Sequence, residues 1–261
     1  MYRILILAVC LAPAALPQEK SLSCEDGSQW RRADHYCEMR EVTIPTSGRL
    51  DVDAGTNGGI SIKGANRSDI LVRSKVEAGW DDHDGQAEAR QIVSEVRVDA
   101  AGGHVRATGP AMERHGWSVS YEIFVPQNTD LQLRTHNGGI SIVGVRGHTE
   151  FEAVNGGVSL MKLAGSVEGH TVNGGLHLEL ASDHWDGDRC DVSTTNGGVT
   201  IEVPSNYSAR LETGTVNGGV NIDFPVTMQG EIGKQISLNL GSGGNLVRAT
   251  TTNGGVRVER M

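Results

Sequence analysis

The chain has 261 residues, a net charge of -9, 35 glycines and only 4% aromatic residues. No run of Lys or Arg forms a basic stripe, so the composition disfavours nucleic-acid binding, and the same acidity disfavours electrostatic docking on an anionic membrane. Abundant glycine with few aromatics suits a narrow coil filled with Val, Leu and Ile.

The first residues, 1–17, predict a secretory signal peptide. Arg3 precedes an apolar run over residues 4–16, and residues 12–14 form an alanine-proline-alanine cleavage pattern. The run is shorter than the roughly 20 residues that cross a bilayer. Lipidation at Cys10 is disfavoured, because a bulky valine precedes it. We therefore expect an exported protein with no transmembrane segment once the signal is removed, located in the periplasm, on the outer surface or in the medium.

Residues 18–40 predict a short N-terminal segment that a disulfide holds in place. Cys24 and Cys37 flank a polar stretch that is too short to fold alone, and a bridge between them fits an exported protein. A half metal site is the rival interpretation, but no second Cys or His pair at zinc spacing accompanies them. Cys190 has no evident partner, and we expect it to be a buried small hydrophobe.

The tripeptide Asn-Gly-Gly occurs seven times, nearly always as T-x-N-G-G followed by an aliphatic residue, any residue and another aliphatic residue. The copies begin at Asn57, Asn137, Asn155, Asn173, Asn196, Asn217 and Asn253. The step from Asn137 to Asn155 and on to Asn173 is 18 residues, too short for a propeller blade. The regular step predicts a structural repeat whose turns fit one another.

Two all-β architectures compete for this repeat. Asn-Gly between alternating apolar runs is a strong signal for an antiparallel hairpin, which would give a meander or sandwich. The uniform copies favour a β-solenoid, similar to a parallel β-helix, in which stacked asparagine amides bond along the stack as a turn ladder. The glycines would supply a positive φ and leave no side chain to collide with the next coil. We predict the solenoid.

The remaining elements fit around this stack, in a single domain over residues 41–261. Periodicity predicts one inserted helix over Gln86–Val96, capped by Asp84, and strands over Ile70–Val76, Val96–Ala107 and Trp117–Val125. The 80 residues before Asn137 are expected to hold several coils without the signature, and Val226–Asn245 is expected to be an inserted loop or hairpin.

A search for catalytic or metal-binding residues returns none. There is no G-x-S-x-G, H-E-x-x-H or P-loop motif. His136, His170 and His177 lie beside the repeated turns and could line one face, although isolated solvated or packed histidines are the more common case. Two acidic segments, Asp81–Gly85 and Asp183–Asp188, place oxygen ligands near a glycine, but neither fits a calcium loop and we expect solvated loops. No cofactor is predicted.

The repeat, the export signal, the segment running into Cys37-Glu38-Met39-Arg40-Glu41, and Trp117–Tyr121 ahead of Val125-Pro126 together resemble the bacterial "putative adhesin" domains of unknown function. The resemblance covers about residues 40–261. It implies a β-solenoid in an exported protein and brings no catalytic residues with it.

Three functions follow as hypotheses. The first is a noncatalytic envelope or surface protein, adhesin-like, that binds a glycan or protein through exposed polar rows such as Ser159, His177, Thr200 and Asn221. The second is a structural scaffold that self-associates through its ends. The third and least favoured is a polysaccharide-active β-helix enzyme, which would need convergent acids and bases in a cleft.

Overall fold

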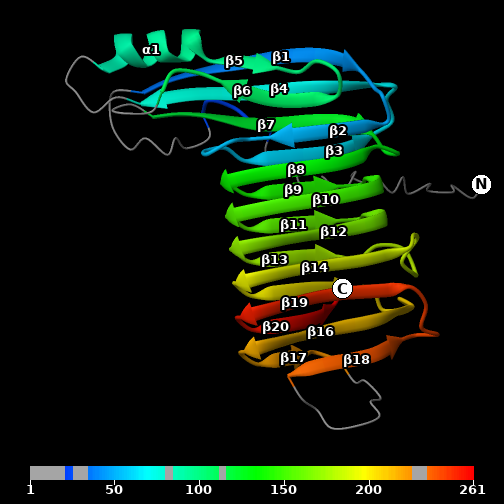
Figure 1. The fold of residues 1–261 in the computed structure, drawn as a ribbon. Helices are drawn as coiled ribbons and strands as arrows, with labels where there is room; N and C mark the ends of the chain where they lie inside the picture. Colours follow the sequence, from blue (N-terminus) through cyan, green and yellow to red (C-terminus); the bar gives the residue numbers. More distant parts are fainter. Residues whose placement is uncertain (1–20, 26–34, 80–84, 112–115, 225–233) are drawn as a thin grey trace, which may run out of the picture.

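The computed structural model describes residues 21–25, 35–79, 85–111, 116–224 and 234–261. The signal peptide predicted at residues 1–17 lies outside these ranges. The chain forms two sheets of ten strands each, stacked as a flattened coil (Figure 1). Sheet A has the strand order β1-β4-β7-β3-β9-β11-β13-β15-β20-β17, and sheet B has the order β18-β16-β19-β14-β12-β10-β8-β2-β6-β5. The predicted β-solenoid is confirmed, and the meander and sandwich are excluded.

Each regular coil places one long strand in sheet B, an Asn-Gly-Gly turn, and one short strand in sheet A. The pairs are β8 (Asp130–Asn137) with β9 (Ile140–Val143), β10 (Arg146–Asn155) with β11 (Val158–Met161), β12 (Ala164–Asn173) with β13 (Leu176–Glu179), β14 (Arg189–Asn196) with β15 (Val199–Val203), β16 (Ala209–Asn217) with β17 (Val220–Ile222), and β19 (Leu246–Asn253) with β20 (Val256–Arg260). Neighbouring coils pair in parallel and in register. Equivalent side chains therefore stack in columns along the molecule.

The core lies between the two sheets. Because strand side chains alternate, every second residue points inward, and the resulting columns are almost fully buried. In sheet A one such column contains Ile140, Val158, Leu176 and Val199, each at most 2% exposed. Burying a side chain of this size contributes about 1.5 to 3 kcal/mol. The repeated aliphatic positions thus fill a narrow interior.

The first glycine of each turn is required by close stacking. A Cβ atom on Gly138 would lie 2.0 Å from the carbonyl oxygen of Gly58, and one on Gly156 would lie 1.9 Å from that of Gly138. The expected positive φ is wrong: of the glycines in the seven turns only Gly254 has one, at 159°, close to the extended region. Successive turns approach so closely that no side chain fits between them.

The N-terminal end is antiparallel, which corrects the expectation of several unmarked coils. In sheet A, β1 (His35–Pro45) pairs antiparallel with β4 (Asp69–Gly79), and β4 pairs antiparallel with β7 (Gly116–Pro126). In sheet B, β5 (Arg97–Asp99) pairs antiparallel with β6 (His104–Thr108). Only β6 and β7 continue the stack, running parallel to β2 (Arg49–Asp53) and β3 (Ile60–Ala65).

The single predicted helix is present as α1 (Gly85–Glu95), and it lies against β1 and β4 at this end of the stack. Its buried face includes Ala89, Ile92 and Val93. Arg40, on β1, donates hydrogen bonds to the carbonyls of Val93 at 2.7 Å and Val96 at 2.6 Å, which satisfies the end of the helix. The cap predicted at Asp84 lies outside the described residues.

The last two coils are exchanged in space. The coil β19–β20 lies between β14–β15 and β16–β17, so it pairs with β14 on one side and β16 on the other (Figure 1). The segment expected as an inserted loop or hairpin supplies β18 (Gln235–Leu240), which pairs antiparallel with β16 and covers that edge of sheet B. Residues 225–233 lie outside the described part.

Candidate functional site

The seven turn asparagines form a continuous side-chain ladder, which we call the asparagine ladder. Nδ2 of Asn155 donates to Oδ1 of Asn137 at 2.8 Å, and Nδ2 of Asn173 donates to Oδ1 of Asn155 at 2.8 Å. Bonds of 2.7 to 3.0 Å join Asn137 to Asn57, Asn196 to Asn173, Asn253 to Asn196 and Asn217 to Asn253. In every bond the Nδ2 donor points to the neighbouring coil on the side of Asn57. The ladder order follows the exchanged coils and not the chain.

A second ladder, which sequence reasoning missed, explains the threonine of the T-x-N-G-G frame. The buried hydroxyl of Thr171 donates to the carbonyl of Gly156 at 2.9 Å. Equivalent bonds of 2.6 to 2.8 Å run from Thr135 to Gly58, Thr194 to Gly174 and Thr251 to Gly197. The repeated threonine was the available signal. It places an inward hydroxyl where the first glycine of the adjacent coil presents its carbonyl group.

Cys24 and Cys37 form a disulfide, with their Cα atoms 5.8 Å apart. Cys37 lies on β1, so the bridge holds residues 21–25 at the N-terminal end of the stack. Near this bridge, the guanidinium group of Arg73 donates to the carbonyl of Leu22 at 3.4 Å. The rival half metal site is excluded, because both sulfur atoms are in the bridge.

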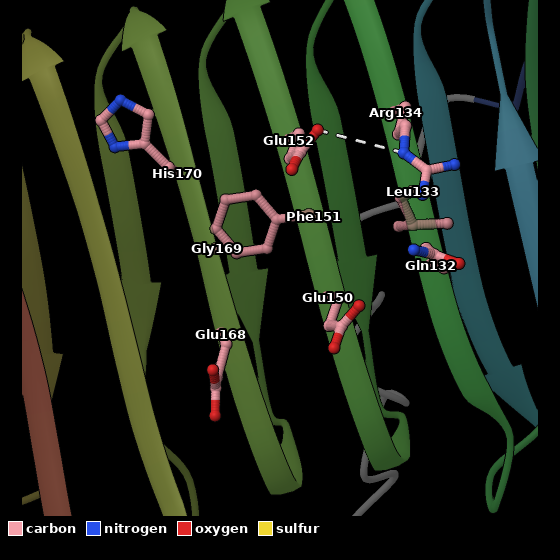
Figure 2. Close-up of a pocket in the computed structure, with 9 residues that line it drawn as sticks. All are labelled: Gln132, Leu133, Arg134, Glu150, Phe151, Glu152, Glu168, Gly169 and His170. Atoms are coloured by element: carbon pink, nitrogen blue, oxygen red, sulfur yellow. Dashed lines mark ion pairs between the residues drawn. The ribbon is translucent and has the colours of Figure 1, made fainter.

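The outer face of sheet B carries a shallow hollow of about 230 Å³ across β8, β10 and β12 (Figure 2). The residues that line it are Gln132, Leu133, Arg134, Glu150, Phe151, Glu152, Glu168, Gly169 and His170. Phe151 lies beside Gly169 in register, and a Cβ atom on that glycine would meet the aromatic ring at 2.4 Å. The missing side chain of Gly169 makes room for the phenylalanine ring, which points into the core and is 2% exposed.

The ionisable groups of this hollow are already paired with their neighbours. Arg134 lies 4.0 Å from Glu152, and His148 lies 2.9 Å from Glu150. Glu168 accepts hydrogen bonds from Arg189, and this carboxylate raises the pKa of the arginine above its ordinary value. Glu152 and Glu168 are thus partners in cross-strand ion pairs, which at an exposed surface contribute little to stability, and Glu150 contacts a histidine of its own strand.

His170 is held by two hydroxyl groups. Its Nδ1 lies 3.0 Å from Oγ of Ser193, and its Nε2 lies 3.1 Å from Oγ1 of Thr195. A histidine that activates a serine needs a third group, usually a carboxylate, to orient its second nitrogen. Here that nitrogen faces another hydroxyl, so the arrangement lacks the orienting acid of a Ser-His-acid triad.

The three histidines near the turns do not share one surface. His136 and His170 lie on strands of sheet B but in different columns, whereas His177 lies on β13 of sheet A. His177 lies 3.9 Å from Glu202 on the adjacent strand. The suggestion that they line one face is therefore wrong.

The outer face of sheet A carries the predicted polar row. Ser159, His177 and Thr200 are directly in register on neighbouring strands, and Arg257 lies between Thr200 and Asn221 because the last coils are exchanged. Ser141 continues the row on β9. A shallow hollow over β15, β20 and β17 is lined by Thr200, Arg257 and Asn221 of this row and by the second glycines of the three turns. We call Ser141, Ser159, His177, Thr200, Arg257 and Asn221 the sheet A row.

Of the two acidic segments, only Asp183–Asp188 lies fully in the described part; Asp81–Asp84 lies outside it. His184 donates to the carboxylate of Asp183 and lowers its pKa, and Asp186 pairs with Arg146 at 2.9 Å. Across the ranges that the structure describes, no group of His, Cys, Asp and Glu side chains is arranged to hold a metal ion.

Cys190 is a fully buried free thiol on β14, in a column between Val167 and Val247. Its pKa is raised first by burial and then by the charge of Asp191. The expectation of a small buried hydrophobe agrees with this position. Burial raises the pKa of the thiol more than the neighbouring carboxylate does.

A family model described as Toastrack DUF4097 matches residues 41–259. The chain belongs to the Toastrack DUF4097 family. This confirms the kind of family that the repeat predicted. In the described part of the chain, no helix is both long enough and apolar enough to cross a membrane. Among curated proteins, nothing matches this Toastrack chain.

Several solved structures resemble the Toastrack stack at low identity. A "putative cell adhesion protein" from Clostridium sporogenes is 11% identical, with a TM-score of 0.47, over 87% of this chain and 100% of that one. A "putative adhesin" from Bacteroides fragilis is 10% identical, with a TM-score of 0.33, over 87% and 97%. A "putative lipid binding protein" from Parabacteroides distasonis is 12% identical, with a TM-score of 0.34, over 86% and 96%. Similarity at this level assigns no role.

Proposed function

We propose that this chain is a noncatalytic, exported protein of the cell envelope or cell surface that binds an extended glycan or protein segment, in the manner of an adhesin. Export is supported by the Cys24–Cys37 disulfide, which persists in oxidising compartments, and by the signal peptide predicted at residues 1–17. The binding surface that we propose is the sheet A row.

The observation that carries this proposal is a set of unengaged hydroxyls on a flat, open face. Within the described residues, Ser141, Ser159 and Thr200 form no side-chain hydrogen bond, although they are in register on successive coils and partly exposed. Successive coils are about 4.8 Å apart. The row therefore offers evenly spaced donors and acceptors to a ligand that runs along the stack.

The outer face of sheet B is a weaker candidate for binding and for catalysis. Its ionisable side chains are engaged with one another, as in the contacts of Arg134 with Glu152 and of His148 with Glu150. A polysaccharide-active enzyme would need a carboxylic acid and a carboxylate free to act on opposite sides of a sugar. The paired state of these residues supports a noncatalytic role.

The test is retention of ligands by the chain without residues 1–17. The protein would be applied to glycan arrays and immobilised, then exposed to extracts of bacterial envelope. The double variant Ser159→Arg and Thr200→Arg would fill the sheet A row, and Ser166→Arg on β12 of sheet B is the matched control. We expect the double variant to lose the bound ligand and the control to keep it. Loss in both variants, or retention in both, would contradict the proposed surface.

Self-association is a second candidate, supported by the edge of sheet A at β17. Val220 and Ile222 are half-buried, whereas the equivalent Val256 and Val258 are at most 2% exposed, and nearby Val216 is 55% exposed. No described strand pairs with the free edge of β17. An edge of this kind can pair with another copy. Sedimentation over a range of concentrations would reject this candidate if the chain stayed monomeric throughout.

A further inference from the structure

The seven Asn-Gly bonds share one chemical hazard. The backbone nitrogen of the glycine can attack Cγ of the preceding asparagine, which forms a succinimide ring and releases the side-chain nitrogen as ammonia. Water then opens the ring to aspartate or to isoaspartate. Glycine favours this step because no side chain blocks its nitrogen, and the attack also needs that N–H to be free to move toward Cγ.

In six of the seven turns the glycine N–H is held by the adjacent coil. Gly138 donates to the carbonyl of Asn155 at 3.1 Å, and Gly156 donates to that of Asn173 at 3.0 Å. The same bond, 3.0 to 3.2 Å long, runs from Gly58 to Asn137, Gly174 to Asn196, Gly197 to Asn253 and Gly254 to Asn217. The glycine nitrogen can move toward Cγ only after this hydrogen bond to the adjacent coil breaks. Attack at these six sites therefore requires local opening of the stack.

Gly218 is the exception, because its coil is the last of the stack. No hydrogen bond from its N–H is formed to any described residue. Gly218 is also exposed, whereas the glycines that follow the six other asparagines are half-buried or buried. The reacting nitrogen is thus free at one of the seven sites.

The side chain of Asn217 is also less restrained. Its Nδ2 donates to Asn253 at 2.7 Å, but its Oδ1 receives no bond from any described residue. Asn57, at the other end of the ladder, likewise has one ladder bond, yet the N–H of Gly58 is held by Asn137 at 3.2 Å. The two ends of the ladder therefore separate the effect of the side-chain bond from that of the glycine N–H.

We propose that Asn217 is a site of selective spontaneous deamidation, at which the nitrogen of Gly218 closes a succinimide on Cγ, ammonia leaves, and water yields aspartate or isoaspartate. Either product removes the Nδ2 donor that bonds to Asn253. Isoaspartate also adds a methylene group to the backbone at the end of β16, two glycines before β17, whose pairing with β20 is only three residues long. The modification thus loosens the last coil and leaves the rest of the stack intact.

The test is site-by-site deamidation of the folded wild-type chain. Trypsin cleaves after Lys and Arg, and their positions place each of the seven asparagines in a peptide of its own, with Asn217 between Arg210 and Lys234. After incubation at mildly alkaline pH, liquid chromatography with mass spectrometry would give the conversion of each peptide. We expect Asn217 to convert at least about tenfold faster than the other six sites, since only they require local opening.

Two controls make the outcome decisive. In a urea-unfolded sample the seven sites should convert at comparable rates, because the fold no longer protects six of them. The variant Asn217→Gln keeps a side-chain amide but would have to close a larger ring, and it should abolish the early mass gain in its peptide. Equal rates at Asn217 and Asn57 in the folded chain, or an early mass gain that persists in Asn217→Gln, would overturn the proposal.

Discussion

The regular stack and the N-terminal end of the molecule are stabilised in different ways. From β8 to β15 every coil repeats two contacts of its neighbour, the asparagine ladder and the close approach of the first glycine of each turn. The threonine hydroxyl bond recurs in all of these coils except β10–β11, which has Ala153 at that position. At the N-terminal end, β1, β4 and β7 pair antiparallel, and individual contacts replace repeated ones. A repeated contact must be satisfied in every coil, whereas an individual contact constrains only its own site.

The ion pairs also differ between the two regions, because the N-terminal end contains buried pairs whereas those of the stack are at least partly exposed. Lys75, Glu77 and Glu122 are at most 5% exposed on β4 and β7, and Lys75 lies 3.1 Å from Glu77 while Lys63 lies 3.3 Å from Glu122. Buried ions must be paired, since removing one partner leaves an uncompensated charge. In the stack, by contrast, ion pairs such as Arg134 with Glu152 are exposed. The end of the solenoid is a specific structure that closes an otherwise extendable stack.

The largest expected effect tests the glycine contact of the stack. Gly156→Ala places a Cβ atom 1.9 Å from the Gly138 carbonyl oxygen, so adjacent coils must separate, and we expect a loss of about 3 kcal/mol in the free energy of unfolding. Gly157→Ala is the matched control, with 3.5 Å to the nearest atom and an expected change within about 0.5 kcal/mol. Urea unfolding measures both. Equal losses would show that close stacking is not the reason for the first glycine.

The next effect concerns the N-terminal end. The double variant Cys24→Ser and Cys37→Ser removes a bridge with a sequence separation of 13, and we expect a loss of about 2 to 3 kcal/mol there. Hydrogen exchange should increase in β1 and β4 while β10 to β15 keep their protection. Uniform acceleration along the whole chain would mean that the two regions unfold as one.

Within the stack, the asparagine ladder should contribute less than the glycines. Asn173→Ala removes two ladder bonds at an exposed edge, and we expect a loss of about 1 kcal/mol in the free energy of unfolding. Asn217→Ala removes one bond and should lose about half as much. Thermal unfolding of both variants tests the ratio. If ligand binding fell while the melting temperature stayed unchanged, the ladder would be a binding feature.

The smallest effect concerns an exposed ion pair of the stack. Hydrogen bonds from Arg248 lower the pKa of Glu212 below its ordinary value of 4.5. The pair therefore stabilises the fold above that value, and the contribution is lost as the pH falls through the pKa of the folded state. Because the two side chains are 41% and 21% exposed, we expect at most about 0.5 kcal/mol. Glu212→Gln should be less stable than wild type at neutral pH and equal to it in acid, as measured by urea unfolding.

Much of the fold could be predicted because the turns are nearly identical. Their regular step indicated the solenoid, and the spacing of Ala89, Ile92 and Val93 indicated α1. Of the two reasons expected for the glycines, the close approach of the next coil agrees with the structure and positive φ does not, because a glycine that avoids a clash and one that adopts positive φ are the same letter in a sequence. The antiparallel end was missed because alternation of apolar residues gives a strand but not its direction.

The proposed site was harder to predict. Ser159, His177 and Thr200 were grouped correctly by their position after the turn, but Arg257 was not, because it reaches the row only through the exchange of the last coils. β16 and β19 carry the same turn, so either could pair with β14 by local criteria. Only the contacts of a particular coil with its neighbours decide between them.

The exchange of the last two coils also constrains the order in which they can fold. During synthesis β16 and β17 are complete before residues 246–261 exist, yet their neighbours in the finished molecule are β19 and β20. The earlier coil must either wait or rest temporarily on β14 and β15 and then give way. The other regular coils can add to the stack in the order in which they leave a ribosome or an export pore. The last two cannot, because the coil β19–β20, which is last in the chain, must take its place before β16–β17 can occupy its final position.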